Sequence, residues 1–254
     1  MPYSFSVYGI STGLLKFGDN FVDRIISALK DTDAKKIEDG DIIIFAESPL
    51  ATTEGRIVKL NEIVPSQKAI EYGRKYKMDE RLAEIVLRES DEIVGGVCGY
   101  LLARRGNLYL PNAGVDESNA PSGYVTLLPK DADESAKRLR DEIREKTGKD
   151  TAVLVIDSRT HAMRMGVCGV AIGVSGILPV TDERGKKDLF GHELHVTRRA
   201  VADNLASSAE LLMGESNEGV PAVLVRGYDF IKSEDAKIEF IAPEDDLFLG
   251  LLKK

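Results

Sequence analysis

The chain has 254 residues, of which 43% are hydrophobic and 30% are charged, a composition that excludes a disordered chain and indicates one or two globular domains. The formal net charge of -8 argues against broad, sequence-independent binding to nucleic acids, because such binding needs clustered Lys and Arg side chains. No stretch approaches the roughly 18 consecutive apolar residues of a membrane span, so we expect no membrane partner.

Two further features predict a cytoplasmic protein. Residues 1–8 lack the basic and apolar regions of a secretory signal peptide. Cys98 and Cys168 are too few for a disulfide framework, and their apolar neighbours indicate that both thiols are reduced and packed in the interior.

The first 50 residues predict two strands and a helix. Residues 3–20 indicate a short strand and a loop of small residues, after which Asp19 or Asn20 caps a helix whose apolar face begins at Phe21. The loop is either a ligand loop or a plain bend. The apolar run 42–45 predicts a buried strand that leads into polar residues, beginning with Glu47.

The middle of the chain predicts helices followed by short strands. A helical region opens at Pro65, and residues 79–90 have the spacing of a half-buried helix. Strands follow between residues 101 and 128, interrupted by a loop dense in Asn, Asp, Ser, Gly and Pro. That loop either consists of plain turns or forms a site for a hard cation and a phosphate. Its candidate oxygen donors are Asn112, Asp116, Ser118 and Asn119.

Residues 133–149 predict an amphipathic helix that stops at Gly148 and delivers the chain to a buried strand over 152–156. That strand is expected to end abruptly at Asp157 and Ser158, where a carboxylate invites a cation. A second apolar run follows, and its glycines Gly169, Gly173 and Gly176 would let a backbone approach a ligand closely. The alternative is that Asp157 caps the next turn and the glycines serve a bulged strand.

The last third predicts a basic loop, a long helix that begins near Val201 and stops at Gly214, a polar loop, a buried strand over 222–225 and an acidic tail ending in a short helix. Strands and helices alternate irregularly, which predicts a mixed α/β or α+β fold. We expect one domain over residues 1–254 with two intertwined subdomains. No P-loop or Rossmann motif is present.

The chemistry-bearing residues favour a hard-cation site over a nucleophile. There is no GxSxG elbow, and His161, His192 and His195 have no evident nucleophile partner, so no catalytic nucleophile is expected. Carboxylates and a hydroxyl gather instead at the ends of buried elements, where magnesium or manganese would find oxygen ligands. A chain with 42 acidic residues offers such sets by chance, so the spacing of these residues alone does not establish a metal site.

Several ordered blocks of sequence carry a resemblance to a known family. They are NAGVDESN at 112–119, ID at 156–157, GVAIGVSGI at 169–177, GKKDLFGHEL at 185–194, VADNLASSAELLMGE at 201–215 and GVPAVLVRG at 219–227. The chain resembles the gamma-glutamyl ligases that attach glutamate to the deazaflavin coenzyme F420. The resemblance implies a homodimeric mixed α/β enzyme, an acid–amino-acid ligase that joins the amine of L-glutamate to a carboxylate acceptor through an acyl phosphate and consumes GTP.

The resemblance also implies ligands and the residues that hold them. It implies two divalent ions, Mg²⁺ or Mn²⁺, with K⁺ as an additional activator. One ion would bind Asp116 and Asp157, and the other would bind Ser158 and Glu215. The nucleotide would contact Ser11, Thr12, Gly13, Ser48, Thr52, Asn119, Gly214, Ser216, Asn217, Gly219 and Val220.

Departures from the family pattern lie in the nucleotide and acceptor regions. The family reads Gly-Leu-Pro where this chain has residues 11–13, and Ser-Lys with a further Lys where it has Glu47, Ser48 and Thr52. After Asp157 the family has Thr-Asn-Gly-Arg, whereas this chain has Ser-Arg-Thr-His at residues 158–161. Where the family has a pair of Arg residues, this chain has Arg164 and Met165. The phosphate cradle therefore loses positive charge, and Glu47 would repel a triphosphate unless a cation intervenes.

The departures keep two alternatives open. One is a paralogue that binds metal and a nucleotide or phosphorylated metabolite without ligating, and the other is a ligase with a different acceptor. Arg164, Arg184 and Lys186 are candidates for binding the amino-acid substrate by charge alone, and solvated surface cations are the alternative for all three.

Overall fold

A five-stranded mixed sheet forms the centre of the computed structural model, which describes residues 4–248. The strand order is β1 (Ser6–Ile10), β12 (Ala222–Arg226), β2 (Ile42–Ala46), β8 (Ala152–Thr160) and β9 (Val167–Ser175). Only β2 and β8 run parallel, and the other neighbours are antiparallel. The predicted mixed α/β class is confirmed, whereas the division into intertwined subdomains stays a prediction.

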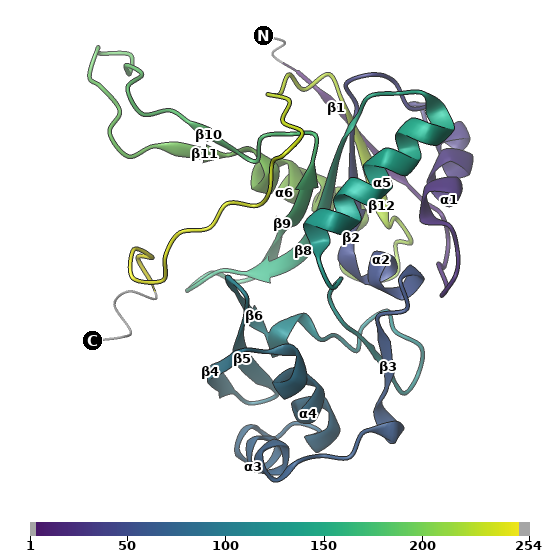
Figure 1. Cartoon of the computed structure of the whole chain (residues 1–254), viewed down its shortest axis with the longest axis vertical. Helices are drawn as coiled ribbons and strands as arrows, with labels where there is room; N and C mark the ends of the chain where they lie inside the picture. Colours follow the sequence, from purple (N-terminus) through teal and green to yellow (C-terminus); the bar gives the residue numbers. More distant parts are fainter. Residues whose placement is uncertain (1–3, 249–254) are drawn as a thin grey trace.

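Helices cover both faces of this sheet. Helices α1 (Phe21–Ala28) and α5 (Ala132–Thr147) pack on one face, and α6 (Val201–Met213) packs on the other. Figure 1 shows α1 and α5 together on one side of the sheet. Asn20 caps α1 by accepting a hydrogen bond from the Asp23 amide, and Gly148 ends α5 in a left-handed conformation, so both predicted helix ends are confirmed.

The apolar run of β2 is continuous because both of its faces are buried. Ile43 and Phe45 belong to the cluster under α1 and α5, and Ile42 and Ile44 belong to the cluster under α6. Consecutive side chains of a strand point to opposite faces, so a strand covered on both sides needs apolar residues at every position.

A third hydrophobic cluster lies in a separate group of elements at one end of the molecule (Figure 1). The group consists of α3 (Gln67–Tyr76), α4 (Glu80–Glu89) and an antiparallel sheet of β4 (Glu92–Val97), β5 (Tyr100–Arg105) and β6 (Leu108–Pro111). The short elements α2 (Glu47–Thr53), β3 (Ile57–Lys59) and β7 (Tyr124–Thr126), with 3-10 turns at Leu29–Asp31, Leu60–Glu62 and Asn112–Gly114, complete the structure between β1 and α5.

The predicted basic loop forms an antiparallel ribbon. Strands β10 (Val180–Asp182) and β11 (Arg198–Ala200) pair with each other and with no other strand of the described chain, and their connection extends away from the body (Figure 1). The tail after β12 has no helix up to residue 248, so the predicted terminal helix is wrong over these residues, and residues 249–254 lie outside the described range.

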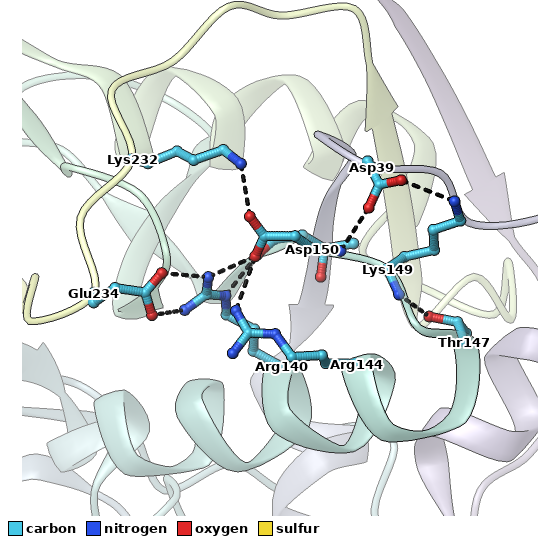
Figure 2. Close-up of polar contacts among 9 residues, drawn as sticks. Asp39, Arg140, Arg144, Thr147, Lys149, Asp150, Lys232 and Glu234 are labelled. Carbon is cyan, nitrogen blue, oxygen red and sulfur yellow. Dashed lines mark hydrogen bonds and ion pairs between the residues drawn. The ribbon is translucent and has the colours of Figure 1, made fainter.

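Ion pairs fasten the tail to α5, as Figure 2 shows. Arg140 is only 4% exposed and binds Glu234 of the tail through two hydrogen bonds of 2.6 and 2.8 Å, and Asp150 at 2.9 Å. Lys232 of the tail binds the other oxygen of Asp150 at 2.6 Å. Hydrogen bonds from Lys232, Arg144 and Arg140 hold the pKa of Asp150 well below its ordinary value, so this carboxylate stays charged.

The structure corrects the prediction that the strand over 152–156 ends at Asp157. Strand β8 continues to Thr160, because β9 supplies antiparallel partners from Val170 to Val167. What changes at Asp157 is burial, since the residues before it are buried and those from Ser158 on are exposed. The apolar sequence pattern therefore shows where the buried core ends, whereas the length of the strand is set by its backbone hydrogen bonds to β9.

The glycines of β9 allow helices α5 and α6 to pack closely on the strand. The register of β8 and β9 shifts between Val155 and Ile156, so the bulged-strand alternative is confirmed. A Cβ at Gly169 would lie 2.5 Å from the carbonyl oxygen of Ala206 in α6, and a Cβ at Gly173 would overlap the backbone of Ala132 at the start of α5. The expectation that these glycines admit a ligand is therefore wrong.

Both cysteines lie at the surface. Cys98 and Cys168 are free and exposed, so the prediction of reduced thiols agrees with the structure, but the prediction that they are packed is wrong. Cys98 belongs to the turn between β4 and β5, and Cys168 lies in the exposed half of β9. Among the described residues, no helix combines the length and apolar character needed to cross a membrane.

Replacement of Gly173 by Ala tests the packing of α5 on the sheet. The new methyl group would collide with the Ala132 backbone, so we expect Gly173→Ala to reduce the free energy of unfolding by about 2 kcal/mol or more, measured by urea denaturation. Gly95→Ala is the matched control, since Gly95 is also a strand glycine and a Cβ there meets nothing within 4 Å. Equal effects of the two substitutions would contradict this account.

Candidate functional site

Three connecting segments meet at one edge of the central sheet because of its topology. The parallel pairing of β2 with β8 ends there, with Ala46 paired to Ile156, although β8 itself continues along β9. Strand β12 runs antiparallel to β2 and therefore starts at this edge, and β1 ends there because Ile10 pairs with Ala222. The segments after β1, after β2 and before β12 are thus neighbours of Asp157, and ligands of α/β sheets commonly bind at such an edge.

A cavity of about 500 Å³ lies at this edge. The loop over 116–119 and the end of α6 both contribute residues to its lining. It is lined by Gly13, Leu14, Leu15, Ala46, Glu47, Ser48, Pro49, Thr52, Asp116, Ser118, Asn119, Ile156, Asp157, Ser158, Glu210, Met213, Gly214, Glu215, Ser216, Asn217, Glu218, Gly219, Val220 and Pro221.

The parallel pairing of β2 with β8 places two carboxylates side by side. Glu47 and Asp157 each follow one residue of the pair Ala46 and Ile156. Burial raises the pKa of Asp157 well above its ordinary value, and the charges of Glu47, Asp116 and Glu215 raise it further. Burial also raises the pKa of Glu47, to which the charge of Asp116 adds. These acids repel one another across the cavity.

A second pair of carboxylates lies at the end of α6. Glu210 is in the last turn of the helix, and Glu215 follows the helix stop at Gly214. Burial raises the pKa of Glu210 to about 8, and the Glu215 carboxyl at hydrogen-bond distance and the charge of Glu47 contribute to the same shift. Without a bound cation, the raised pKa keeps Glu210 mostly protonated at neutral pH.

Some of the lining acids have hydrogen-bond donors of their own. The Ser48 hydroxyl donates to Glu47, and the Ser118 hydroxyl and amide donate to Asp116, the amide at 2.9 Å. The Ser216 amide donates to Glu218 at 2.9 Å. Among the described residues, no donor reaches Oε2 of Glu210, although this atom is buried.

The charge of the cavity is one-sided. Its acids are Glu47, Asp116, Asp157, Glu210, Glu215 and Glu218, and none of the described lining residues is Lys, Arg or His. Within residues 4–248 no three acidic, His or Cys side chains lie close enough together to form a complete metal site as they stand. The donor set nevertheless fits hard divalent ions, since it is all oxygen and an acidic oxygen in it lacks a partner.

Part of the cavity lining is apolar. Leu14 and Leu15 come from the loop after β1, and Met213 and Val220 come from either end of the segment between α6 and β12. Leu14 is 75% exposed, so its side chain has apolar surface available for a ligand. A ligand with one flat apolar end and one anionic end would match this lining once bound cations neutralise the acids.

The structure brings together most of the residues predicted from the sequence. All four predicted metal ligands line the cavity, and so do the predicted nucleotide residues except two. Ser11 and Thr12 are not in the lining. Ser11 lies beside Gly219, and the Thr12 carbonyl accepts a hydrogen bond from Arg24 at 2.6 Å. The roles of these residues stay predictions.

Other candidates lie elsewhere. Asn112 is buried, and its Oδ1 accepts a hydrogen bond from the Leu101 amide at 2.9 Å, so it supports β5 and is not available as a cation ligand. Arg184 pairs with Asp182 and Lys186 pairs with Glu183, both on the β10–β11 ribbon. Arg164 lies in the exposed turn between β8 and β9. None of the three cations lines the cavity.

Sequence reasoning missed the roles of Glu47 and Glu210 in the cavity. Glu47 follows a buried strand just as Asp157 follows the apolar part of β8, and this shared position is the signal that could have grouped the two acids. Glu210 carried a weaker signal: it is an acid in the last turn of a helix, where the helix dipole disfavours negative charge.

Comparison with known proteins gives a family match and several relatives. A profile described as "F420-0:Gamma-glutamyl ligase" matches residues 9–227. The chain is 39% identical over 241 residues to the coenzyme F420:L-glutamate ligase of Methanothermobacter thermautotrophicus, an alignment that covers 93% of this chain and 95% of that protein. It is 43% identical over 211 residues to the enzyme of the same name from Methanopyrus kandleri, covering 83% and 81% of the two chains. For Methanocaldococcus jannaschii the identity is 42% over 214 residues, covering 84% and 86%.

The raised pKa of Glu210 predicts how pH acts on the metal-free protein. The folded chain keeps this proton up to a pH of about 8, whereas the unfolded chain loses it near 4.5, so folding stability falls as the pH rises between these values. In Glu210→Gln this loss is absent. Between pH 5 and pH 8 in EDTA, we expect the variant to gain about 1 kcal/mol or more of unfolding free energy relative to the wild type, because one pKa unit corresponds to about 1.4 kcal/mol.

The measurement is urea denaturation at a series of pH values. Glu145→Gln, on the exposed face of α5, is the control and should track the wild type at every pH. A difference between Glu210→Gln and the wild type that does not change with pH would contradict the assignment.

Proposed function

The chain belongs to the F420-0:gamma-glutamyl ligase family and is an enzyme, and from that premise we propose that it joins L-glutamate to the carboxylate of a coenzyme F420-type deazaflavin at the expense of GTP. The observation that carries the proposal is that all four predicted metal ligands line one and the same acidic cavity. A triphosphate and an acceptor carboxylate are both anionic, and the residues lining this cavity offer them no positive side chain.

The proposed reaction has two steps and needs no protein nucleophile. An oxygen of the acceptor carboxylate attacks the γ-phosphorus of GTP, forming a new O–P bond while the bond to GDP breaks. The amine of glutamate then attacks the carbonyl carbon of this acyl phosphate. An N–C bond forms, inorganic phosphate leaves with the electrons of the C–O bond, and the nitrogen gives up its proton. Catalysis of this kind depends on positioning and charge neutralisation.

We propose that Asp116 and Asp157 hold one divalent ion and that Ser158 and Glu215 hold the other, Mg²⁺ or Mn²⁺ in both cases. Such ions neutralise the charge on a transferring phosphoryl group. The fit is supported by the all-oxygen donor set and by the burial and mutual repulsion that together raise the pKa of Asp157. Two divalent cations would relieve that repulsion. Activation by K⁺, a homodimeric state and a cytoplasmic location remain predictions.

For the nucleotide, we propose that its phosphates lie toward the metal ligands and that its base lies toward the apolar lining residues Leu14, Leu15, Met213 and Val220. Ser48, Thr52, Asn119 and the loop 214–221 offer hydroxyl, amide and backbone groups around the cavity. Gly214 has a φ of 69°, a conformation that suits glycine and turns the chain sharply from α6 into this loop. A different carboxylate acceptor remains the alternative, since the lining does not specify the acceptor.

Replacement of Asp157 by Asn tests the metal assignment. With F420 lacking its glutamates, GTP, L-glutamate and Mn²⁺, the wild type should release GDP and phosphate and form the glutamyl product, and omission of any component should stop it. We expect Asp157→Asn to lose about 100-fold or more of the turnover rate at saturating metal, because a lost metal ligand removes several kcal/mol of transition-state stabilisation. The control is Asp141→Asn on the exposed surface of α5. A wild-type rate for Asp157→Asn would refute the assignment.

Thermal shift with nucleotides tests binding separately from turnover. At about 100 times the dissociation constant, a ligand adds about 2.7 kcal/mol of stability, which for a chain of this size raises the melting temperature by roughly 5–10 °C. We expect this shift for GTP with Mn²⁺ and little shift for GTP in EDTA. Indifference to every nucleotide would count against the ligase and favour a different phosphorylated ligand. Binding without turnover for any acceptor would favour the non-ligating alternative.

A further inference from the structure

Glu210 is a cavity acid that the proposed metal and nucleotide assignments leave without a role. It lies in the last turn of α6, where the Gly214 amide bonds its carbonyl oxygen. Its side chain lines the cavity, and Oε2 is buried and receives no hydrogen bond from the described chain. A negative charge at the C-terminal end of a helix is unfavourable, so the local structure does not account for this carboxylate.

The described surroundings of Glu210 hold its side chain in place but supply no positive charge. A Cβ on Gly169 of β9 would lie 2.7 Å from Oε2, so the glycine makes the space that this oxygen occupies. The charged groups that face it from neighbouring elements are the carboxylates of Glu215 and Glu47. A buried carboxylate oxygen without a donor is costly, and a cationic ligand with several hydrogen-bond donors would satisfy it.

We propose that Glu210 binds the ammonium group of the amino-acid substrate, an inference that rests on the proposed function. Among the substrates of that reaction, the amine of glutamate is the one group that carries a positive charge at neutral pH. An ammonium group has three donors and no acceptor, so one such group can bind Glu210 and the adjacent carboxylate of Glu215 together.

The position of Glu210 suits this role. The attacking nitrogen must reach the acyl carbon of the acyl phosphate, and it must first give one proton to the carboxylate that binds it, because an ammonium nitrogen has no free electron pair. Glu215 is a proposed ligand of one of these ions and lies at hydrogen-bond distance from Glu210. An ammonium bound at Glu210 is therefore held next to the reacting group. The other acids suit it less well, since Glu47 and Asp116 already accept hydrogen bonds from Ser48 and Ser118.

Steady-state kinetics of Glu210→Gln, with metal and GTP saturating, gives the first test. The amide keeps the shape of the side chain and removes the charge, so the KM for glutamate should rise about tenfold or more, as expected for loss of a charged hydrogen bond. The KM for GTP and the Mn²⁺ and K⁺ concentrations for half-maximal activity should change by less than about twofold. Glu210→Asp should recover part of the loss, and Glu145→Gln should have no effect.

Two kinetic outcomes would overturn the proposal. An unchanged KM for glutamate would exclude Glu210 from binding the amine. A raised requirement for Mn²⁺ or K⁺, with glutamate binding unaffected, would assign the residue to an inorganic cation. A melting curve of each variant establishes that the protein is folded, and a folded Glu210→Asp variant provides the test if Glu210→Gln does not fold.

A binding experiment keeps the inference separate from the ligase assignment. Glutarate is glutamate without its amino group, so the preference for glutamate over glutarate measures recognition of the ammonium. By calorimetry on the full chain with Mn²⁺ and a non-hydrolysable GTP analogue, we expect the wild type to bind glutamate at least about tenfold more tightly than glutarate and Glu210→Gln to bind both equally. The same preference in both proteins, or no binding of glutamate to the wild type, would overturn the inference. Absence of turnover alone would refute only the proposed function.

Discussion

Repulsion among carboxylates at one edge of the central sheet is the constraint to which the rest of the site responds. Glu47 and Asp157 are neighbours because β2 and β8 run parallel and pair Ala46 with Ile156. Asp116 and Glu215 approach the same point from other loops, and burial raises the pKa of Asp157. No basic side chain lies among the described lining residues, so the proposed cations would be the source of positive charge that relieves this repulsion.

The scaffold can hold like charges together because its core is covered on both sides. The sheet is packed between α1 and α5 on one face and α6 on the other, and its buried strands leave little freedom for the loops at their ends. Close contact of Gly169 with α6 and of Gly173 with α5 fixes both helices against β9. Rigid elements of this kind keep a site in its geometry when the site itself is unfavourable for stability.

Family membership and the departures from the family pattern concern different parts of the site. The matched region ends at residue 227, so it includes every lining residue of the cavity and excludes the tail that Arg140 binds. Within that region, the predicted metal ligands all meet in the cavity, whereas Ser48 and Thr52 stand where lysines were expected and Glu47 stands where a serine was expected. The loss of two bases and the gain of an acid make the cavity more dependent on cations, and the role proposed for Glu210 with a positively charged substrate group agrees with this dependence.

The sequence by itself determined which segments form the core, because apolar periodicity follows burial and caps such as Asn20 and Gly148 act locally. It also determined the candidate ligands, through ordered motifs that extend over most of the chain. Only the tertiary structure decided which strands pair and in what register, so the proximity of Glu47 to Asp157 and the place of Glu210 beside Glu215 could not be read from spacing. The tertiary structure also decided that the β9 glycines serve helix packing and that β8 extends past Asp157. The physical reason is that these features arise from contacts between residues far apart in sequence, which no local pattern encodes.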